Sequence, residues 1–345
     1  MTNYFYEAGI SFTLYLQSLG DWLVPVMLFF TYLGREEFFL LFMPILYWCL
    51  DAKLWLRLGI LLMISNGVGL ILKSAFHSPR PYWISPEVTA HAHETSFGLP
   101  SGHATNAAAF WGLLAATLKK SWVWVLMLLT IFLIGFSRLY LGVHYSLDVV
   151  AGWLLGFLLL WIFLKLETPV VTWLRNQKLA MQYLVVFAAS LSFVLVAWMV
   201  KISLGGWQVP VNWVANAAAA VPGEQPINPL SLEGMMTVVG VLFGLGAGSI
   251  WIAERGGFDT HGIWWRRALR YPIGLVVVLI LYAGLGAVFP DGETLLAYSL
   301  RYLRYALIGF WIAGLAPLVF IKLNLANEGS QPEVSRKKNR IIRLD

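Results

Sequence analysis

Residues 73–148 contain three polar clusters, which read KSAFHSPRP (73–81), PSGH (100–103) and SRLYLGVHYSLD (137–148). Almost everything around them is apolar: 59% of the 345 residues are hydrophobic and only 12% are charged, with 17 Trp and 21 Phe. This composition excludes a soluble domain and is typical of an integral membrane protein. Because charged and titratable side chains are costly at membrane depth, the three clusters predict a functional site.

The first cluster contains groups that suit a phosphate. Lys73 closes an apolar run, and Pro79 and Pro81 are expected to keep the chain at Arg80 extended rather than helical. Lysine provides a compact charge and arginine a planar fork, and the two together match the oxygens of a phosphate group. Lys73 and Arg80 are therefore predicted to bind an anion such as a phosphate.

The second cluster begins a predicted helix at residues 101–118. Ser101 is expected as the residue that caps the helix, and Gly102 lets a ligand approach the backbone. The free N–H groups of the first helical turn would then face an anion. His103, in the same turn, suits protonation of a leaving oxygen.

The third cluster pairs an imidazole with a carboxylate. His144 and Asp148 are four residues apart, and side chains at that spacing share one face of a helix. The carboxylate can fix the imidazole tautomer and stabilise its charged form, which leaves the other ring nitrogen free to attack phosphorus. Taken singly, such residues also fit a packed histidine, a snorkelling lysine or, for Arg138, an interfacial anchor. Their occurrence together in one short stretch favours a site.

The three clusters resemble the three-part signature of the type 2 phosphatidic acid phosphatase superfamily: Lys-x6-Arg-Pro, Pro-Ser-Gly-His and Ser-Arg-x5-His-x3-Asp, without a substitution. The resemblance covers about residues 20–166. It implies an all-α, six-helix membrane core that hydrolyses phosphate monoesters or diphosphates of lipids without a metal or other cofactor. It also implies that His144 is the nucleophile that forms a phosphohistidine, that Asp148 orients it, and that His103 is the general acid. The resemblance further assigns the phosphate to Lys73, Arg80, Ser101, Gly102 and Arg138.

Apolar segments predict the remaining organisation. Residues 1–20 are expected to form an interfacial helix, and residues 167–323 a membrane extension that begins with a polar linker. Residues 324–345 are expected to be a basic, disordered tail attracted to anionic lipid. The core at 21–166 is predicted to contain helices at about 21–34, 37–51, 54–75, 102–118, 122–141 and 145–166. The extension is predicted to add four transmembrane helices, at about 181–200, 234–253, 271–289 and 303–322.

Two further patterns concern loops and helix packing. The loop at 76–99 contains His91, His93 and Glu94, which suggest a metal site only weakly; a loop that contacts substrate is favoured. The small residues at 104–109 favour close helix packing, and Asn106 is expected to bond to a neighbouring helix rather than to His103. The glycines at 240, 244 and 248 predict a second packing face.

The cations and the single cysteine limit the possible partners. A formal charge of +6 would fit nucleic acid, but the cations lie in short loops and a tail, which membrane topology explains better. We therefore expect membrane lipids and a lipid phosphate as partners, and no nucleic acid. Cys49 is the only cysteine and allows no intrachain disulfide.

Three alternative functions stay open beside a lipid phosphatase. They are a vanadate-dependent haloperoxidase, a sugar-phosphate phosphatase, and a catalytically silent lipid-binding or transport protein on the same fold. The membrane-spanning composition disfavours the haloperoxidase, because such relatives are soluble. The presence of His103, His144 and Asp148 disfavours the silent protein.

The positive-inside rule predicts the orientation in the membrane. The three clusters lie at one set of predicted helix ends, and the opposite ends of the core carry most of the remaining cations, namely Lys53, Arg57, Lys119, Lys120, Lys165, Arg175 and Lys178. The rule therefore predicts a site outside the cytoplasm. Counting the predicted spans places both termini in the cytoplasm.

Overall fold

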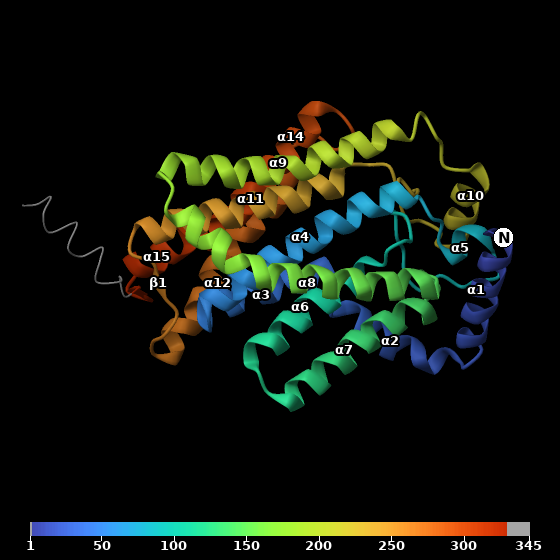
Figure 1. Cartoon of the computed structure of the whole chain (residues 1–345), viewed down its shortest axis with the longest axis horizontal. Helices are drawn as coiled ribbons and strands as arrows, with labels where there is room; N and C mark the ends of the chain where they lie inside the picture. The colour runs from blue at the N-terminus through green and yellow to red at the C-terminus, as the bar shows by residue number, and fades with distance from the viewer. Residues whose placement is uncertain (1, 330–345) are drawn as a thin grey trace, which may run out of the picture. The chain divides into compact units, whose positions relative to one another are not determined.

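The computed structural model describes residues 2–329, and only the backbone of residues 2, 3, 5, 36 and 37 among them. Figure 1 shows a fold built almost entirely of helices. Its longer helices are α1 (Thr2–Gln17), α2 (Val24–Tyr32), α3 (Glu36–Cys49), α4 (Ala52–Phe76), α6 (Gly102–Leu118), α7 (Ser121–Tyr140), α8 (Ser146–Arg175), α9 (Leu179–Ser203), α10 (Val211–Ala220), α11 (Glu233–Glu254), α12 (Trp264–Leu279) and α14 (Leu295–Phe310).

The remaining elements are short. They are the helical turns η1 (Asp21–Leu23), α5 (Pro81–Ile84), η2 (Ile280–Gly284), α13 (Leu285–Val288), η3 (Trp311–Leu315) and α15 (Ala316–Lys322), and the antiparallel strands β1 (Phe258–Asp259) and β2 (Asn327–Glu328). Within the described residues, seven helical segments are long and apolar enough to cross a membrane. The predicted all-α, polytopic fold is therefore confirmed.

The core contains the six expected helices, but two of them are shorter than a membrane span. Helices α2 and α3 have 9 and 14 residues, whereas a bilayer core needs about 20. Neither α2 nor α3 is therefore among the described helices that are long enough to cross a membrane alone. By contrast, α4, α6, α7 and α8 begin and end within two residues of the prediction, except that α8 continues to Arg175.

The continuation of α8 replaces much of the predicted polar linker. The helix passes through Pro169 and ends at Arg175, because a proline in a membrane helix costs only one backbone hydrogen bond and bends the helix rather than ending it. In the extension, the four predicted helices are present as α9, α11, α12–α13 and α14–α15. The two last are continuous through the π-helical turns η2 and η3.

Chain contacts divide the molecule into two compact units that are not continuous in sequence. The first comprises residues up to 39, 61–176 and 191–235, and it contains all three motifs. The second comprises 40–60, 177–190 and the described residues from 236 onward. The loop after α9 therefore belongs to the motif-bearing unit, since α10 packs against α5 (Figure 1).

Glycines on α8 allow α6 and α8 to pack backbone to backbone. A Cβ on Gly152 would lie 2.7 Å from the Ser101 carbonyl oxygen, and one on Gly156 would lie 2.4 Å from that of Thr105. The small residues of α6, including Ala104 and Ala108, complete this contact. The predicted close packing is thus confirmed, and it places the start of α6 against the first turns of α8.

Polar side chains link α6 to α4. Asn106 Nδ2 donates to Asn66 Oδ1 at 2.8 Å, and Ser65 Oγ donates to Asn106 Oδ1 at 2.8 Å. Asn106 therefore bonds to the neighbouring helix, as expected, and this network ties the second motif to α4, whose last turn contains Lys73.

In the second unit, the predicted glycine face is also present. Cβ atoms on Gly244 and Gly248 would lie 2.2 Å from the Ala306 carbonyl oxygen and 2.9 Å from the Gly314 nitrogen, so α11 packs closely on α14 and η3. Arg270 is fully buried there, and it donates to the carbonyl oxygens of Trp48, Thr260, His261 and Leu325. This arginine links four chain segments.

The first residues of the expected tail, 324–329, belong to the described structure. Residues up to 329 are ordered, with Leu325 and Ala326 buried and Asn327–Glu328 paired with Phe258–Asp259. The basic cluster at 336–338 lies outside the described residues.

Candidate active site

Arg80 is held by the loop around it rather than by a helix. Its backbone is extended, with φ −99° and ψ 159°, as the flanking prolines predict. Its side chain is fully buried, and its Nε donates to the Ser96 carbonyl oxygen at 2.7 Å. Its Nη1 donates to the Val143 carbonyl oxygen at 2.8 Å, and its Nη2 donates to that of Phe97 at 3.1 Å. These bonds fix the guanidinium plane.

Lys73, at the end of α4, reaches the same loop. Its Nζ donates to the Phe97 carbonyl oxygen at 2.6 Å and to Ser96 Oγ at 3.1 Å. The loop itself packs against the third motif, because a Cβ on Gly98 would lie 3.0 Å from Asp148 Oδ2. The segment 96–98 therefore connects the two cations of the first motif with the carboxylate of the third.

His144 precedes α8, and Asp148 lies in the first turn of that helix. The imidazole Nδ1 is 3.1 Å from Asp148 Oδ2, and the same oxygen accepts from the Tyr145 backbone N–H at 2.9 Å. A carboxylate partner at Nδ1 places the proton there and leaves Nε2 as the acceptor. Arg80 Nη1 lies 3.1 Å from that Nε2. The expected pairing is thus present, although His144 stands just outside the helix.

The second motif meets the third through the backbone. The Ser101 N–H donates to the Asp148 carbonyl oxygen at 2.9 Å, and Ser101 is the residue before the first turn of α6, as predicted. Its hydroxyl makes no capping bond. A Cβ on Gly102 would meet only the Lys73 side chain, at 3.9 Å, so the space beside this glycine is open.

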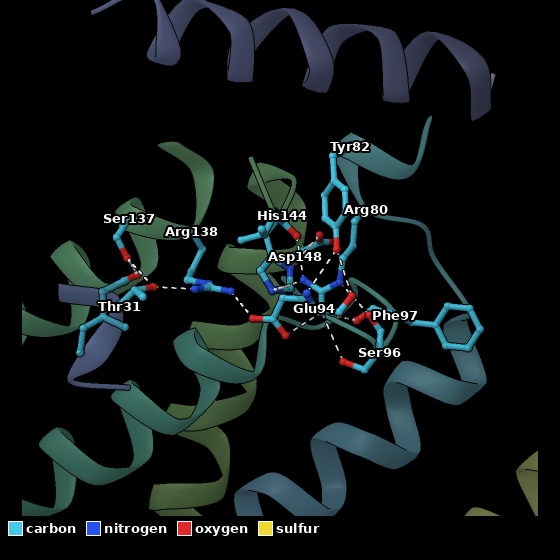
Figure 2. A network of polar contacts seen from close by, with 12 residues as sticks. Thr31, Arg80, Tyr82, Glu94, Ser96, Phe97, Ser137, Arg138, His144 and Asp148 are labelled. Atoms are coloured by element: carbon cyan, nitrogen blue, oxygen red, sulfur yellow. Dashed lines mark hydrogen bonds and ion pairs between the residues drawn. The ribbon is translucent and has the colours of Figure 1, made fainter. Parts of the chain in front are cut away.

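Arg138 lies between a threonine and a glutamate that the sequence did not single out as its partners. Its Nη1 donates to Thr31 Oγ1 of α2 at 2.6 Å, and its Nη2 forms a short ion pair with Glu94 Oε1 (Figure 2). The other carboxylate oxygen, Oε2, lies 3.5 Å from Arg80 Nη2. Glu94 thus joins the arginines of the first and third motifs.

Polar atoms of three motif residues are buried and have no hydrogen-bond partner within the described protein. They are Ser101 Oγ, His103 Nε2 and Arg138 Nε. Buried polar atoms are normally paired, so three such atoms on the residues expected to meet a phosphate indicate that a ligand completes the site.

His91 and His93 of the 76–99 loop, which weakly suggested a metal site, have different surroundings. His91 stacks on Tyr140, with ring centroids 6.3 Å apart, and its backbone N–H donates to the Leu141 carbonyl oxygen. His93 has two buried ring nitrogens without a partner. Among the described residues, no group of three His, Cys, Asp or Glu side chains has the arrangement that could hold a metal ion.

The site carries a strong positive field. Burial, followed by the charges of Arg80 and Lys73, lowers the pKa of His144 well below its ordinary value. Burial alone would raise the pKa of Glu94, but Arg80 and Arg138 outweigh it and hold that pKa well below its usual range. The imidazole is therefore neutral and the carboxylate ionised near neutral pH.

This arrangement can perform nucleophilic chemistry on an anion. It combines a neutral imidazole oriented by a carboxylate, a second histidine with a free nitrogen, and cations fixed by backbone carbonyls. Thr31, Glu94, Ser96 and Phe97 belong to it in addition to the predicted residues.

Comparisons with known proteins agree with this geometry. A family model of the PAP2 superfamily matches residues 54–171, and a model described as the PAP2 superfamily phosphatase, transmembrane extension, matches residues 236–328. The chain is 32% identical over 148 residues to an undecaprenyl-diphosphatase of Sulfolobus acidocaldarius, an alignment that covers 41% of this chain and 70% of that protein. It is also 32% identical over 155 residues to phosphatidylglycerophosphatase B of Bacillus subtilis, covering 41% of this chain and 73% of that protein.

A match that covers a smaller share of the relative is a probable sphingosine-1-phosphate phosphatase of Dictyostelium discoideum, at 38% identity over 137 residues, covering 35% of this chain and 32% of that protein. Among solved structures, a transmembrane PAP2 type phosphatidylglycerolphosphate phosphatase from Bacillus subtilis aligns with a TM-score of 0.41 and 24% identity, over 48% of this chain and 86% of that chain. The family models, and relatives at 32% identity of which the chain covers more than two thirds, show that this integral, multi-pass membrane protein belongs to the PAP2 superfamily.

Proposed function

We propose that this protein hydrolyses phosphate monoesters or diphosphates of membrane lipids, with His144 as the nucleophile. The observation that carries the proposal is the convergence of all three motifs on one unit, with Ser101 Oγ, His103 Nε2 and Arg138 Nε buried and unpaired. The names of its relatives support the substrate class, because an undecaprenyl-diphosphatase, a phosphatidylglycerophosphatase and a sphingosine-1-phosphate phosphatase are all named for a phosphate on a lipid.

The first chemical step is transfer of the phosphoryl group to the enzyme. The Nε2 lone pair of His144 attacks phosphorus, the bond from phosphorus to the leaving oxygen breaks, and His103 donates a proton to that oxygen. Arg80 Nη1 faces this lone pair at 3.1 Å, so a phosphate that takes the Arg80 donors also frees the nucleophile. Lys73, Arg80 and Arg138 neutralise the charge on the phosphoryl oxygens.

The second step returns the enzyme to its starting state. His103, now neutral, takes a proton from a water molecule as that water attacks the phosphohistidine. The bond between phosphorus and Nε2 breaks, inorganic phosphate forms, and His144 is again a neutral imidazole. Asp148 fixes the tautomer and stabilises the positive charge that the ring carries in between.

Phosphate release from purified protein tests this function. A panel in detergent would contain a polyprenyl diphosphate, phosphatidate, phosphatidylglycerol phosphate, sphingosine 1-phosphate and a soluble sugar phosphate. We expect turnover of at least one lipid and its loss in His144→Ala. Full turnover in His144→Ala would refute the mechanism. Lipid binding without phosphate release would favour the silent binding protein, and release from the sugar phosphate alone would favour a soluble-substrate phosphatase.

We also propose that the site faces away from the cytoplasm. The cations at the opposite helix ends support this orientation. The N-terminus goes to the same side as the site in this proposal, because α1 contacts the motif-bearing ends: Gln17 Nε2 donates to the Thr89 and Tyr140 carbonyl oxygens. This placement of the N-terminus differs from the sequence-based expectation of two cytoplasmic termini.

Cysteine labelling distinguishes the two topologies. In a Cys49→Ala background, single cysteines would replace Tyr4, Glu87 or Lys120, all of which are exposed. With a membrane-impermeant maleimide on intact cells, we expect labelling at positions 4 and 87 and not at 120. Labelling at 87 but not at 4 would restore a cytoplasmic N-terminus and contradict the proposed placement of α1, and labelling at 120 but not at 87 would reverse the proposed orientation of the site.

A further inference from the structure

The Glu94 carboxylate lies between Arg80 and Arg138, the two arginines that are expected to hold the phosphate. Its Oε1 pairs with Arg138, and its Oε2 lies 3.5 Å from Arg80 (Figure 2). Each oxygen therefore faces a different guanidinium group, as two oxygens of one phosphoryl group would. A phosphate cannot take both arginines while the carboxylate keeps them.

The arginines are fixed, whereas the glutamate is free to leave. The side chains of Arg80 and Arg138 are 0% and 1% exposed, whereas that of Glu94 is 22% exposed. Arg80 is bonded to three backbone carbonyls, and Arg138 is bonded to Thr31. A ligand that enters the site would therefore move the carboxylate rather than the arginines.

The backbone of Glu94 can stay in place during such a movement. The Tyr82 hydroxyl donates to the Glu94 carbonyl oxygen at 3.0 Å and accepts from its N–H at 3.3 Å. Tyr82 itself is fully buried. With this anchor, rotation of the glutamate side chain alone can release both arginines and later restore both ion pairs.

From these contacts we propose that Glu94 is an internal competitor for the phosphate site, which yields to the substrate and returns to displace inorganic phosphate. This inference rests on the proposed function, since it assigns Glu94 a task in the same reaction cycle. Three buried cations alone would hold the product tightly, because Lys73, Arg80 and Arg138 face the same anion. The Glu94 carboxylate is tethered beside the arginines, so it competes with phosphate at an effective concentration on the order of millimolar. This competition lowers the affinity for inorganic phosphate, while the substrate can still enter the site.

A purely structural role for Glu94 predicts the opposite change in phosphate affinity when its charge is removed. If Glu94 only held the two arginines in place, its neutralisation would misplace them and weaken phosphate binding. If it competes with phosphate, its neutralisation strengthens binding. The direction of the change therefore decides between a structural ion pair and an internal competitor.

The test measures inorganic phosphate and vanadate binding to the purified full chain in detergent, by calorimetry and as inhibition of aryl phosphate hydrolysis. Glu94→Gln keeps the size of the side chain and removes its charge. We expect both anions to bind about tenfold more tightly in this variant, and the KM and kcat to fall together if phosphate release limits turnover. Glu94→Asp retains the charge with a shorter reach, so its phosphate affinity should lie between those of wild type and Glu94→Gln.

Glu87→Gln is the matched control, because Glu87 is an exposed glutamate in the same loop; its phosphate affinity should equal that of wild type. Unchanged or weaker phosphate binding in Glu94→Gln, in protein whose thermal unfolding matches wild type, would overturn the inference. If Glu94→Gln misfolds, Glu94→Asp decides, since affinity no higher than wild type would also overturn it. Tighter phosphate binding in a protein that hydrolyses no lipid phosphate would support the competition but refute the proposed function.

Discussion

Asp148 makes two contacts through one oxygen, to the His144 imidazole and to the Tyr145 N–H. An asparagine at this position can keep the backbone contact but cannot stabilise a charged imidazole. We expect Asp148→Asn to lower kcat by at least about 10²-fold, with a change in thermal unfolding of no more than a few degrees. An equal loss of kcat and of folded protein would instead indicate a structural role.

The protonation of His144 is expected to determine how phosphatase activity falls as the pH is lowered. Burial and the neighbouring cations lower its pKa, so the imidazole stays neutral below the ordinary histidine value of about 6.5 and loses its nucleophilic form only at lower pH. We expect titration of the His144 ring, identified by nuclear magnetic resonance through its absence in His144→Ala, to show a midpoint below about 6.5 in the phosphate-free enzyme. A midpoint above that value would contradict the assigned environment.

At the residue scale, the sequence identified every motif residue of the site but not its partners. His144, Asp148 and Arg80 could be predicted because their spacing carries the signal. Thr31 and Glu94 could not, because their roles depend on contacts across 107 and 44 residues. Neither residue lies in a periodic pattern, so only the folded chain shows that they meet Arg138.

The interface of α6 and α8 joins the second motif to the third, and it has no room for a side chain at Gly156. A Cβ there would lie 2.4 Å from the Thr105 carbonyl oxygen. We expect Gly156→Ala to lower the free energy of unfolding by about 1–3 kcal/mol and to reduce turnover.

Gly69 on α4 is the matched control for this interface, because an added Cβ would meet nothing within 4 Å. Gly69→Ala should leave stability unchanged or raise it by up to about 1 kcal/mol. The midpoints of thermal unfolding of Gly156→Ala and Gly69→Ala are compared in detergent. Equal midpoints would contradict the close packing of α6 on α8.

An aromatic cluster from the loop around α10 packs against Phe97, whose segment 96–98 contacts the cations of the first motif. The ring centroid of Trp207 lies 5.8 Å from that of Phe97 and 5.2 Å from that of His77. The ring centroids of Trp213 and Trp83 are 6.1 Å apart. The carbonyl of Phe97 accepts from the cations of the first motif. This contact gives the region beyond the core a role that its composition did not reveal.

We expect Trp207→Ala to weaken phosphate and vanadate binding by about tenfold, because loss of ring packing lets the Phe97 carbonyl shift. Trp207→Phe should restore most of the affinity. Trp264→Ala is the control, since that ring is 77% exposed. Calorimetry measures the affinity of the three variants for phosphate and vanadate. Equal affinities in Trp207→Ala and Trp264→Ala would remove Trp207 from this role.

At the scale of the whole molecule, hydropathy predicted where most of the long helices lie and in which order, because a bilayer demands long apolar segments. It did not predict that α2 and α3 are too short to cross alone, since two short apolar runs separated by charges also fit two spans. It also placed the loop after α9 in a separate extension, whereas Asn216 Nδ2 donates to the Trp83 and Ile84 carbonyl oxygens beside the first motif. Such pairings depend on the fold and leave no local signal.

The whole protein should act without a divalent metal. Lys73, Arg80 and Arg138 lie within one buried network and supply the positive charge that a metal would otherwise provide. We expect phosphate release to continue at an unchanged rate in excess chelator, and vanadate to inhibit by occupying the site. Loss of activity in chelator that Mg²⁺ or Zn²⁺ restores would contradict this expectation.

The central claim is that His144 carries the phosphoryl group during turnover. Rapid quenching with a substrate labelled in its phosphate tests it most directly, followed by mapping of the label on the protein. The expected result is an acid-labile, base-stable phosphohistidine on the peptide that contains His144, absent in His144→Ala. A label on another residue, or an equal label in His144→Ala, would contradict the account.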